Sequence, residues 1–155
     1  MFLPTRDDGG FTLLQLLITL AIAAILAALS LPAYDRYIRH TQLQAARAAL
    51  LENAHFLERF YQQHKSFKQN STTWPTLPIT ETDAFCIRLH GVARGLPHDK
   101  FTLKAVAFDQ EREPRVLKIN EALTATICET TINSCDDDNT FFKGQNADKK
   151  CRVFN

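Results

Sequence analysis

The chain has 155 residues, a length typical of one domain, and its 18 Lys and Arg residues nearly balance its 17 Asp and Glu residues, for a formal net charge of +1. This balance excludes a protein that holds a polyanion by bulk charge, so any nucleic-acid binding requires an arranged patch of cations. The hydrophobic fraction of 45% excludes a disordered chain. The familiar phosphate-binding, zinc-protease and serine-hydrolase motifs are absent from the sequence. We therefore expect no enzymatic activity and no cofactor.

An uncharged, mostly apolar segment runs from Phe11 to Tyr34. In a helix that rises about 1.5 Å per residue, a segment of this length can cross a hydrocarbon core of roughly 30 Å. A cleaved secretory signal is the alternative, but such a signal needs small residues after its apolar core. Here the small residues Gly9 and Gly10 precede the core. We therefore predict that residues 11–34 form the transmembrane half of a helix.

The residues after Asp35 change to an amphipathic pattern with helical spacing. Apolar side chains recur every three or four residues, as on a helix that buries one face. One helix of about fifty residues, half in lipid and half packed on a soluble domain, accounts for both segments. The predicted apolar stripe consists of Leu43, Ala46, Leu50, Ala54, Leu57 and Tyr61.

The residues around the apolar run form a specific motif. It consists of Gly10-Phe11-Thr12-Leu13-Leu14, the uncharged run with Pro32, and the tyrosines Tyr34 and Tyr37. This motif resembles the N-terminus of type IV prepilins. The resemblance implies that residues 1–10 are a leader, that a prepilin peptidase cleaves after Gly10, and that Phe11 becomes the N-methylated first residue. It also implies a protein that starts in the inner membrane of a Gram-negative bacterium and then joins other pilin subunits in a surface pilus.

Two features depart from the prepilin pattern. The leader contains Asp7-Asp8 where basic residues are usual, and the fifth mature residue is Gln15, where the family normally has Glu. In the family that carboxylate is thought to pair with the N-terminal amine of a neighbouring subunit. A neutral amide cannot neutralise an ammonium group in lipid, where an unpaired charge is costly. Gln15 therefore predicts a minor pilin rather than the main filament subunit.

Four strand-like segments follow a loop, residues 66–84, that is rich in Ser, Thr and Pro. The segments are rich in apolar and β-branched residues, the first two alternate clearly, and Gly and Pro mark turns between them. A long helix packed on a four-stranded antiparallel sheet is an α+β fold. We expect residues 35–155 to form this soluble headgroup. The four predicted strands cover residues 85–92, 101–108, 116–120 and 124–129.

Four cysteines in an exported domain predict two disulfides, for which three pairings exist. In a simple meander Cys86 opens the first strand and Cys128 closes the fourth, about 14 Å away, which exceeds the Cα separation of roughly 7 Å that a disulfide can span. That distance disfavours Cys86–Cys128 with Cys135–Cys151. We favour Cys86–Cys135 with Cys128–Cys151, which would fasten the C-terminal segment across the sheet.

Two further features each have an ordinary and a functional interpretation. The acidic triplet at residues 136–138 resembles a calcium loop, but a solvated turn is the simpler explanation, and we predict no metal site. Trp74 either packs its loop onto the domain or contacts a ligand.

Cations gather on one face of the predicted sheet. Because side chains alternate between faces along a strand, the apolar positions next to Arg88, Lys104 and Lys118 place these three cations on the face opposite the helix, and Lys100 points the same way. Within the first three predicted strands, no carboxylate shares that face. The sequence therefore predicts an arranged cationic patch, although solvent-facing strands also carry Lys for other reasons.

Several segments resemble the competence family of type IV minor pilins, the receptors for DNA uptake sequences, and the resemblance runs through most of the chain. It implies capture of extracellular double-stranded DNA that carries a short uptake sequence, for natural transformation. It also implies that the basic strand positions of the family correspond to Arg88, Lys104 and Lys118. The resembling segments are residues 48–56, 74–75, 86–89, 100–101, 103–106 and 142–144.

We expect two kinds of DNA contact. A flat sheet is too broad to enter a major groove about 12 Å wide, so the sheet cations should contact phosphates, which position a duplex without reading its sequence. Base contacts need protruding elements. An alternative is a structural or adhesive minor pilin whose basic stripe contacts other subunits or anionic surfaces. The candidate protruding residues are Asn70 and Trp74 in the loop, and Lys143, Lys149 and Lys150 in the C-terminal segment.

Overall fold

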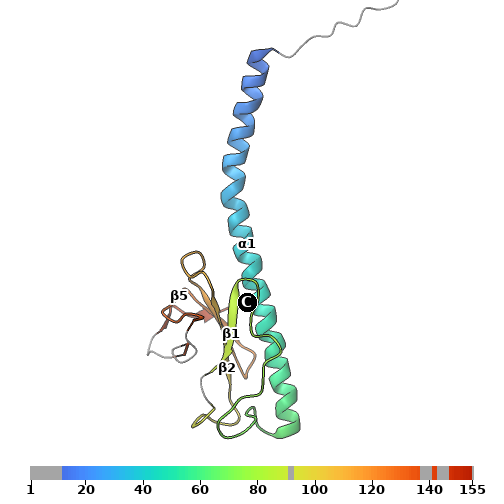
Figure 1. Ribbon diagram of the computed structural model, residues 1–155, viewed down its shortest axis with the longest axis vertical. Coiled ribbons are helices and arrows are strands. Elements are labelled where there is room, and N and C mark those ends of the chain that lie inside the picture. The colour runs from blue at the N-terminus through green and yellow to red at the C-terminus, as the bar shows by residue number, and fades with distance from the viewer. Residues whose placement is uncertain (1–11, 91–92, 137–140, 143–146, 155) are drawn as a thin grey trace, which may run out of the picture. The chain divides into compact units, whose positions relative to one another are not determined.

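The computed structural model describes residues 12–90, 93–136, 141–142 and 147–154. The chain divides into two compact units, residues 1–38 and residues 39–155. Helix α1 (Leu13–His64) contributes to both units (Figure 1). The predicted processing residues Gly10 and Phe11 lie outside the described residues.

In the first unit, α1 exposes large apolar side chains along its length. By length and composition this helix is long and apolar enough to cross a membrane. A capping box closes its first turn: Thr12 N donates to Gln15 Oε1 over 3.0 Å, and Gln15 N donates to Thr12 Oγ1 over 3.3 Å. Pro32 lies inside the helix, and its carbonyl accepts a hydrogen bond from Arg36 Nε at 3.2 Å. The amide of Gln15 therefore satisfies the backbone of its own helix.

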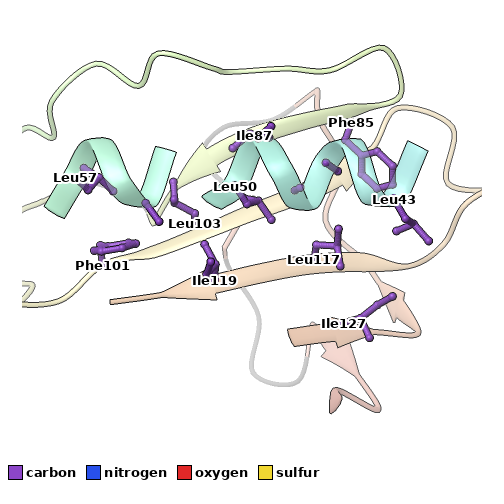
Figure 2. Close-up of a cluster of buried hydrophobic side chains, with 14 of the residues drawn as sticks. Leu43, Leu50, Leu57, Phe85, Ile87, Phe101, Leu103, Leu117, Ile119 and Ile127 are labelled. Carbon is purple, nitrogen blue, oxygen red and sulfur yellow. The ribbon is translucent and has the colours of Figure 1, made fainter. Parts of the chain in front are cut away.

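In the second unit, α1 buries one stripe of side chains against the sheet (Figure 2). Five of the six predicted stripe residues are buried, and the sixth, Tyr61, is half-buried with its ring centroid 4.6 Å from that of Phe67. The helix ends at His64 because Lys65 turns to a left-handed conformation, with φ 56°, and its N–H donates to the Tyr61 carbonyl over 2.7 Å. The five buried residues are Leu43, Ala46, Leu50, Ala54 and Leu57.

The main sheet is antiparallel with the strand order β1-β2-β3-β4-β7. One face packs on α1, so the predicted α+β fold is confirmed (Figure 2). The four predicted strands are present with similar bounds, and the fifth strand was not predicted because two residues show no alternation. The strands are β1 (Phe85–Leu89), β2 (Thr102–Ala107), β3 (Val116–Asn120), β4 (Ala125–Cys128) and β7 (Arg152–Val153).

The described part of the C-terminal segment (residues 129–151) packs on the other face of the sheet. Within it β5 (Thr130–Thr131) pairs with β6 (Asp148–Lys149) as a separate two-stranded sheet. A second, smaller core forms between this segment and the sheet, and it contains Val106, Val116 and Phe141. Disulfides Cys86–Cys135 and Cys128–Cys151 attach the segment, in the pairing that the sequence favoured.

The loop between α1 and β1 is fixed at both ends. Near its start, Phe67 N donates to the His98 carbonyl over 2.9 Å, and the Phe67 ring packs edge-on against Phe101 at 4.8 Å. Near its end, the fully buried Asn53 of α1 donates from Nδ2 to the Ile79 carbonyl over 2.6 Å and accepts from Ile79 N over 3.1 Å. The tip of the loop is thus held at a set position beside the sheet.

Candidate nucleic-acid interface

The strand register aligns three cations into one row. Arg88 of β1 lies directly opposite Lys104 of β2, and Lys104 lies opposite Lys118 of β3. All three belong to the face that α1 does not cover, as alternation predicts. We call Arg88, Lys104 and Lys118 the cation row. Like charges directly opposite each other destabilise a sheet, so this row requires compensation.

A single carboxylate supplies much of that compensation. Asp148 of β6 accepts from Lys104 Nζ at Oδ1 over 2.7 Å and from Lys118 Nζ at Oδ2 over 2.8 Å. Lys104 Nζ also donates to Asn133 Oδ1 over 2.7 Å and to the Phe141 carbonyl over 3.2 Å. The sheet and the C-terminal segment are therefore joined by a charged network as well as by disulfides.

The environment of this network shifts two pKa values. Burial raises the pKa of Asp148, but hydrogen bonds from Lys104, Lys118 and Thr131 outweigh burial and hold this pKa below its usual value. For Lys104, burial lowers the pKa of the ammonium group, Asp148 opposes this shift, and the nearby charge of Lys118 lowers the pKa further, so that it lies below its usual value.

The expectation that Lys104 projects toward solvent is wrong. Its side chain is on the predicted face, but it is only 1% exposed because the C-terminal segment covers it with Asn133, Phe141 and Asp148. Alternation tells which face a side chain occupies, not what lies on that face. Lys104 therefore serves as an internal anchor for the segment, and a phosphate cannot reach it in this conformation.

The other two members of the cation row retain access to solvent. The Lys118 side chain is 27% exposed although it pairs with Asp148. Arg88 is half-buried, and its guanidinium carbon lies 6.0 Å from the ring centroid of Phe141. Its Nη1 donates to the carbonyls of Thr80 over 3.3 Å and Ile87 over 3.1 Å, and because an Arg beside an aromatic ring keeps its charge, Arg88 can still attract an anion.

The remaining predicted cations lie outside the cation row. Lys100 is exposed just before β2, and Lys149 and Lys150 are exposed in the C-terminal segment. Lys150 pairs with Glu129 over 3.0 Å, but both side chains are largely exposed, and such pairs contribute little. Lys143 lies outside the described residues, as do two of the three residues of the acidic triplet. Among the described residues, no group of three potential metal ligands occurs.

A cleft of about 350 Å³ lies next to the cation row along the same strands. Its lining includes His90, Thr102 and Asn120, which continue β1, β2 and β3 on the same face, two residues from the cation row. Trp74 and Lys100 also line it. Thr102 and Asn120 were not among the predicted site residues, although extending the alternation argument by one step along each strand identifies them.

The two loop candidates have different roles in the structure. Trp74 Nε1 donates to the His90 carbonyl over 2.9 Å, so Trp74 packs the loop onto the end of β1 while its ring lines the cleft. Asn70 is exposed, and its Oδ1 accepts from the backbone N–H groups of Thr72 and Thr73, each over 2.9 Å. That oxygen closes the turn of the loop, so any DNA contact of Asn70 would use its Nδ2 donors.

Comparison with known proteins places the chain among pilins. The family described as "Type IV minor pilin ComP, DNA uptake sequence receptor" matches residues 32–135. The solution structure of ComP from Neisseria subflava, titled a minor DNA-uptake pilin, shares 54% identity with a TM-score of 0.59, and the match covers 72% of this chain and 94% of that one. The type IV pilin ComP from Neisseria meningitidis shares 50% identity with a TM-score of 0.53, over 77% of this chain and 99% of that one.

Curated relatives match over a shorter region. The type IV major pilin protein PilE1 of Neisseria gonorrhoeae is 36% identical over 64 residues, which is 41% of this chain and 39% of that protein. The chain therefore spans about two fifths of the length of this relative. The family match, in contrast, begins at residue 32 within α1 and extends through the loop and the first four strands of the headgroup. The chain belongs to the ComP family of type IV minor pilins.

Proposed function

We propose that this chain is a pilus receptor that binds extracellular double-stranded DNA during natural transformation and prefers duplexes with a short uptake sequence. The observation that carries the proposal is the cation row beside a cleft whose lining includes His90, Thr102 and Asn120. Cations position a duplex through its phosphates, and hydrogen-bonding side chains beside them can read base edges. The description of the family supports the same function.

The proposed DNA contacts are of two kinds, contacts to phosphates and contacts to bases. Arg88, Lys118 and Lys100 are available to phosphates, with Lys118 sharing its charge with Asp148. Asn70 and Trp74 in the first loop, and Lys149 and Lys150 in the C-terminal segment, lie outside the strands of the main sheet and are assigned to base contacts. The same assignment is proposed for Lys143, which lies outside the described residues. A net charge of +1 limits the number of phosphate contacts, which favours selectivity over bulk affinity.

The membrane and filament steps complete the proposal. A prepilin peptidase removes residues 1–10, residues 11–34 lie in the inner membrane, and residues 35–155 form the headgroup of a subunit in a pilus on the surface of a Gram-negative bacterium. The apolar first part of α1 and the pilin relatives support this sequence of events.

The test is a selection from a pool of random DNA duplexes, with the full chain held in detergent micelles. We expect one short motif to be enriched, and a duplex with that motif to outcompete its scrambled counterpart at raised salt. A variant with Arg88→Ala and Lys118→Ala should recover less DNA of any sequence. Failure to enrich a motif, with equal binding of both duplexes, would refute the proposal.

One observation favours a second function, a structural or adhesive minor pilin. Asp148 neutralises part of the cation row and Lys104 is buried, so less positive charge reaches the surface than the sequence suggests. A patch of this kind can also bind an anionic surface or another subunit. Selectivity for one duplex at raised salt separates the two functions, because a purely electrostatic patch has none.

A further inference from the structure

Asp148 occupies an unusual place in the interface. Its two carboxylate oxygens contact different lysines of the cation row, Lys104 and Lys118, and its side chain is only 10% exposed. The carboxylate comes from β6, which pairs with β5 and not with the strands that carry the lysines. One acidic group of the C-terminal segment therefore neutralises cations on two strands of the main sheet.

This placement changes what the cation row can do for DNA. Non-specific affinity depends on how many phosphates the protein neutralises, and it carries no sequence information. By pairing with Lys118, the carboxylate of Asp148 removes one accessible cation from that count. The same carboxylate holds the C-terminal segment, which carries Lys149 and Lys150, at a fixed position on the sheet.

We infer that Asp148 is a specificity-determining residue: it lowers the affinity for DNA of any sequence by neutralising the accessible Lys118, and through its bond to the buried Lys104 it positions the C-terminal segment for sequence-dependent contacts. The inference rests on the proposed function. On this account, Asp148 sets the ratio between the affinity for a duplex with the preferred sequence and the affinity for a scrambled duplex. Asp148 is a positioning residue in this account, since it acts through the two lysines and the segment.

Glu129 provides a matched control for the loss of one negative charge. It pairs with Lys150 over 3.0 Å in the same region of the chain, but its side chain is 56% exposed and that of Lys150 is 77% exposed. Asp148→Asn and Glu129→Gln therefore each remove one negative charge; the first change removes two ion pairs, with Lys104 and Lys118, and the second removes one, with Lys150. They differ in that only Asp148 contacts the cation row.

The experiment measures binding of a selected duplex and its scrambled counterpart by the full chain in detergent, at three salt concentrations. For Asp148→Asn we expect tighter binding of the scrambled duplex, and a plot of log affinity against log salt that is steeper by about 0.9 because Lys118 gains a phosphate. The ratio of selected to scrambled affinity should fall about fivefold or more, which corresponds to one base contact. Glu129→Gln should leave this ratio unchanged.

A second variant identifies the cation that Asp148 restrains. Combining Asp148→Asn with Lys118→Gln should return the salt dependence to that of the parent protein. Hydrogen exchange at Thr131, Asn133 and Lys149 should accelerate in Asp148→Asn and not in Glu129→Gln, because only the first change loosens the segment.

Two results overturn the inference: equal effects of Asp148→Asn and Glu129→Gln, or weaker binding of both duplexes by Asp148→Asn with an unchanged salt dependence. A parent protein that does not distinguish the two duplexes refutes the proposed function instead. In that case, comparing the salt dependence of scrambled-duplex affinity between the parent protein and Asp148→Asn still shows whether Asp148 keeps Lys118 from contacting a phosphate.

Discussion

The two faces of the main sheet are held by different forces. The face toward α1 buries a continuous set of apolar side chains between long elements, whereas the opposite face is covered by a segment with two-residue strands, two disulfides and one charged network. The apolar packing between α1 and the sheet is spread over many contacts, so no single residue decides where the helix lies on the sheet. The covered outer face depends on a few specific links, and it is also the face with the candidate DNA contacts.

This contrast predicts how each face responds to damage. Loss of a side chain on the α1 face should weaken the whole domain, because the helix and every long strand share that core. Loss of a link on the outer face should release the C-terminal segment and leave the rest folded.

The largest effect is expected from Cys151→Ser. The Cys128–Cys151 bridge closes a sequence separation of 23 residues, and the loss of such a constraint costs about 3.5 kcal/mol by chain entropy. Residues after Thr130 should exchange hydrogen faster and become sensitive to proteases, and DNA binding should fall. Hydrogen exchange by mass spectrometry locates the change. Parent-like resistance to proteolysis with parent-like DNA binding would show that this bridge is dispensable.

Leu50→Ala should cause a loss of stability of similar size, but one that affects the whole domain rather than the C-terminal segment alone. Leu50 is 2% exposed in the core beneath the sheet, and removal of such a side chain costs about 3 kcal/mol. Denaturant unfolding should show one cooperative transition at lower midpoint, with faster exchange in β1 to β4 together. Leu51→Ala, next to it but only half-buried, is the control and should cost less than half as much. Faster exchange confined to one strand would contradict a shared core.

Acid should loosen the outer face by a smaller amount. Because the pKa of Asp148 in the folded protein is below its usual value, its contribution to stability is present above the unfolded pKa of about 3.9 and is lost as pH falls through the folded pKa. The effect is smaller than removal of the residue because a protonated carboxyl group still forms hydrogen bonds. Melting curves of the parent and Asp148→Asn between pH 7 and pH 2 test this. Their difference should narrow below about pH 4, and a constant difference would assign the stabilisation elsewhere.

The smallest expected effect is a change in the salt dependence of DNA binding, and it distinguishes Arg88 from its neighbour Lys104 in the cation row. Arg88→Met should flatten the dependence of log DNA affinity on log salt by about 0.9, because one phosphate contact is lost. Lys104→Met should leave that slope unchanged, because the Lys104 side chain is 1% exposed and held by Asp148. Titrations of one duplex at three salt concentrations are sufficient. Equal slopes for the two variants would mean that Lys104 becomes accessible when DNA binds.

The α1 face could be predicted from the sequence because its pattern is periodic. Leu43, Leu50 and Leu57 repeat at helical spacing, and the predicted strands alternate, so each element identifies its own buried side. The position of the cation row followed from the same alternation. Both inferences depend only on the pattern of residues that are close together in the sequence.

The covering of the outer face could not be predicted in the same way. Asp148 is 44 residues from Lys104 along the chain and belongs to a two-residue strand, which has no period to detect. The disulfide pairing indicated that the C-terminal segment returns to the sheet, but not which side chains it brings. For this reason the sequence identified Lys104 as a cation on the right face and missed that the segment buries it.

The two hydrogen bonds between the Asn53 side chain and the backbone of Ile79 have a consequence for how related pilins can evolve. Because the buried amide fixes the backbone at the end of the loop and Phe67 fixes its start, the exposed residues 69–73 at the tip can change without altering the core, whereas Trp74 and Leu77 pack against it. Related pilins can therefore acquire new loop tips, including the turn at Asn70, at little cost in stability. Exchange of this loop tip between two family members therefore offers a route by which one scaffold changes the surface that it presents, while the sheet and the helix stay the same.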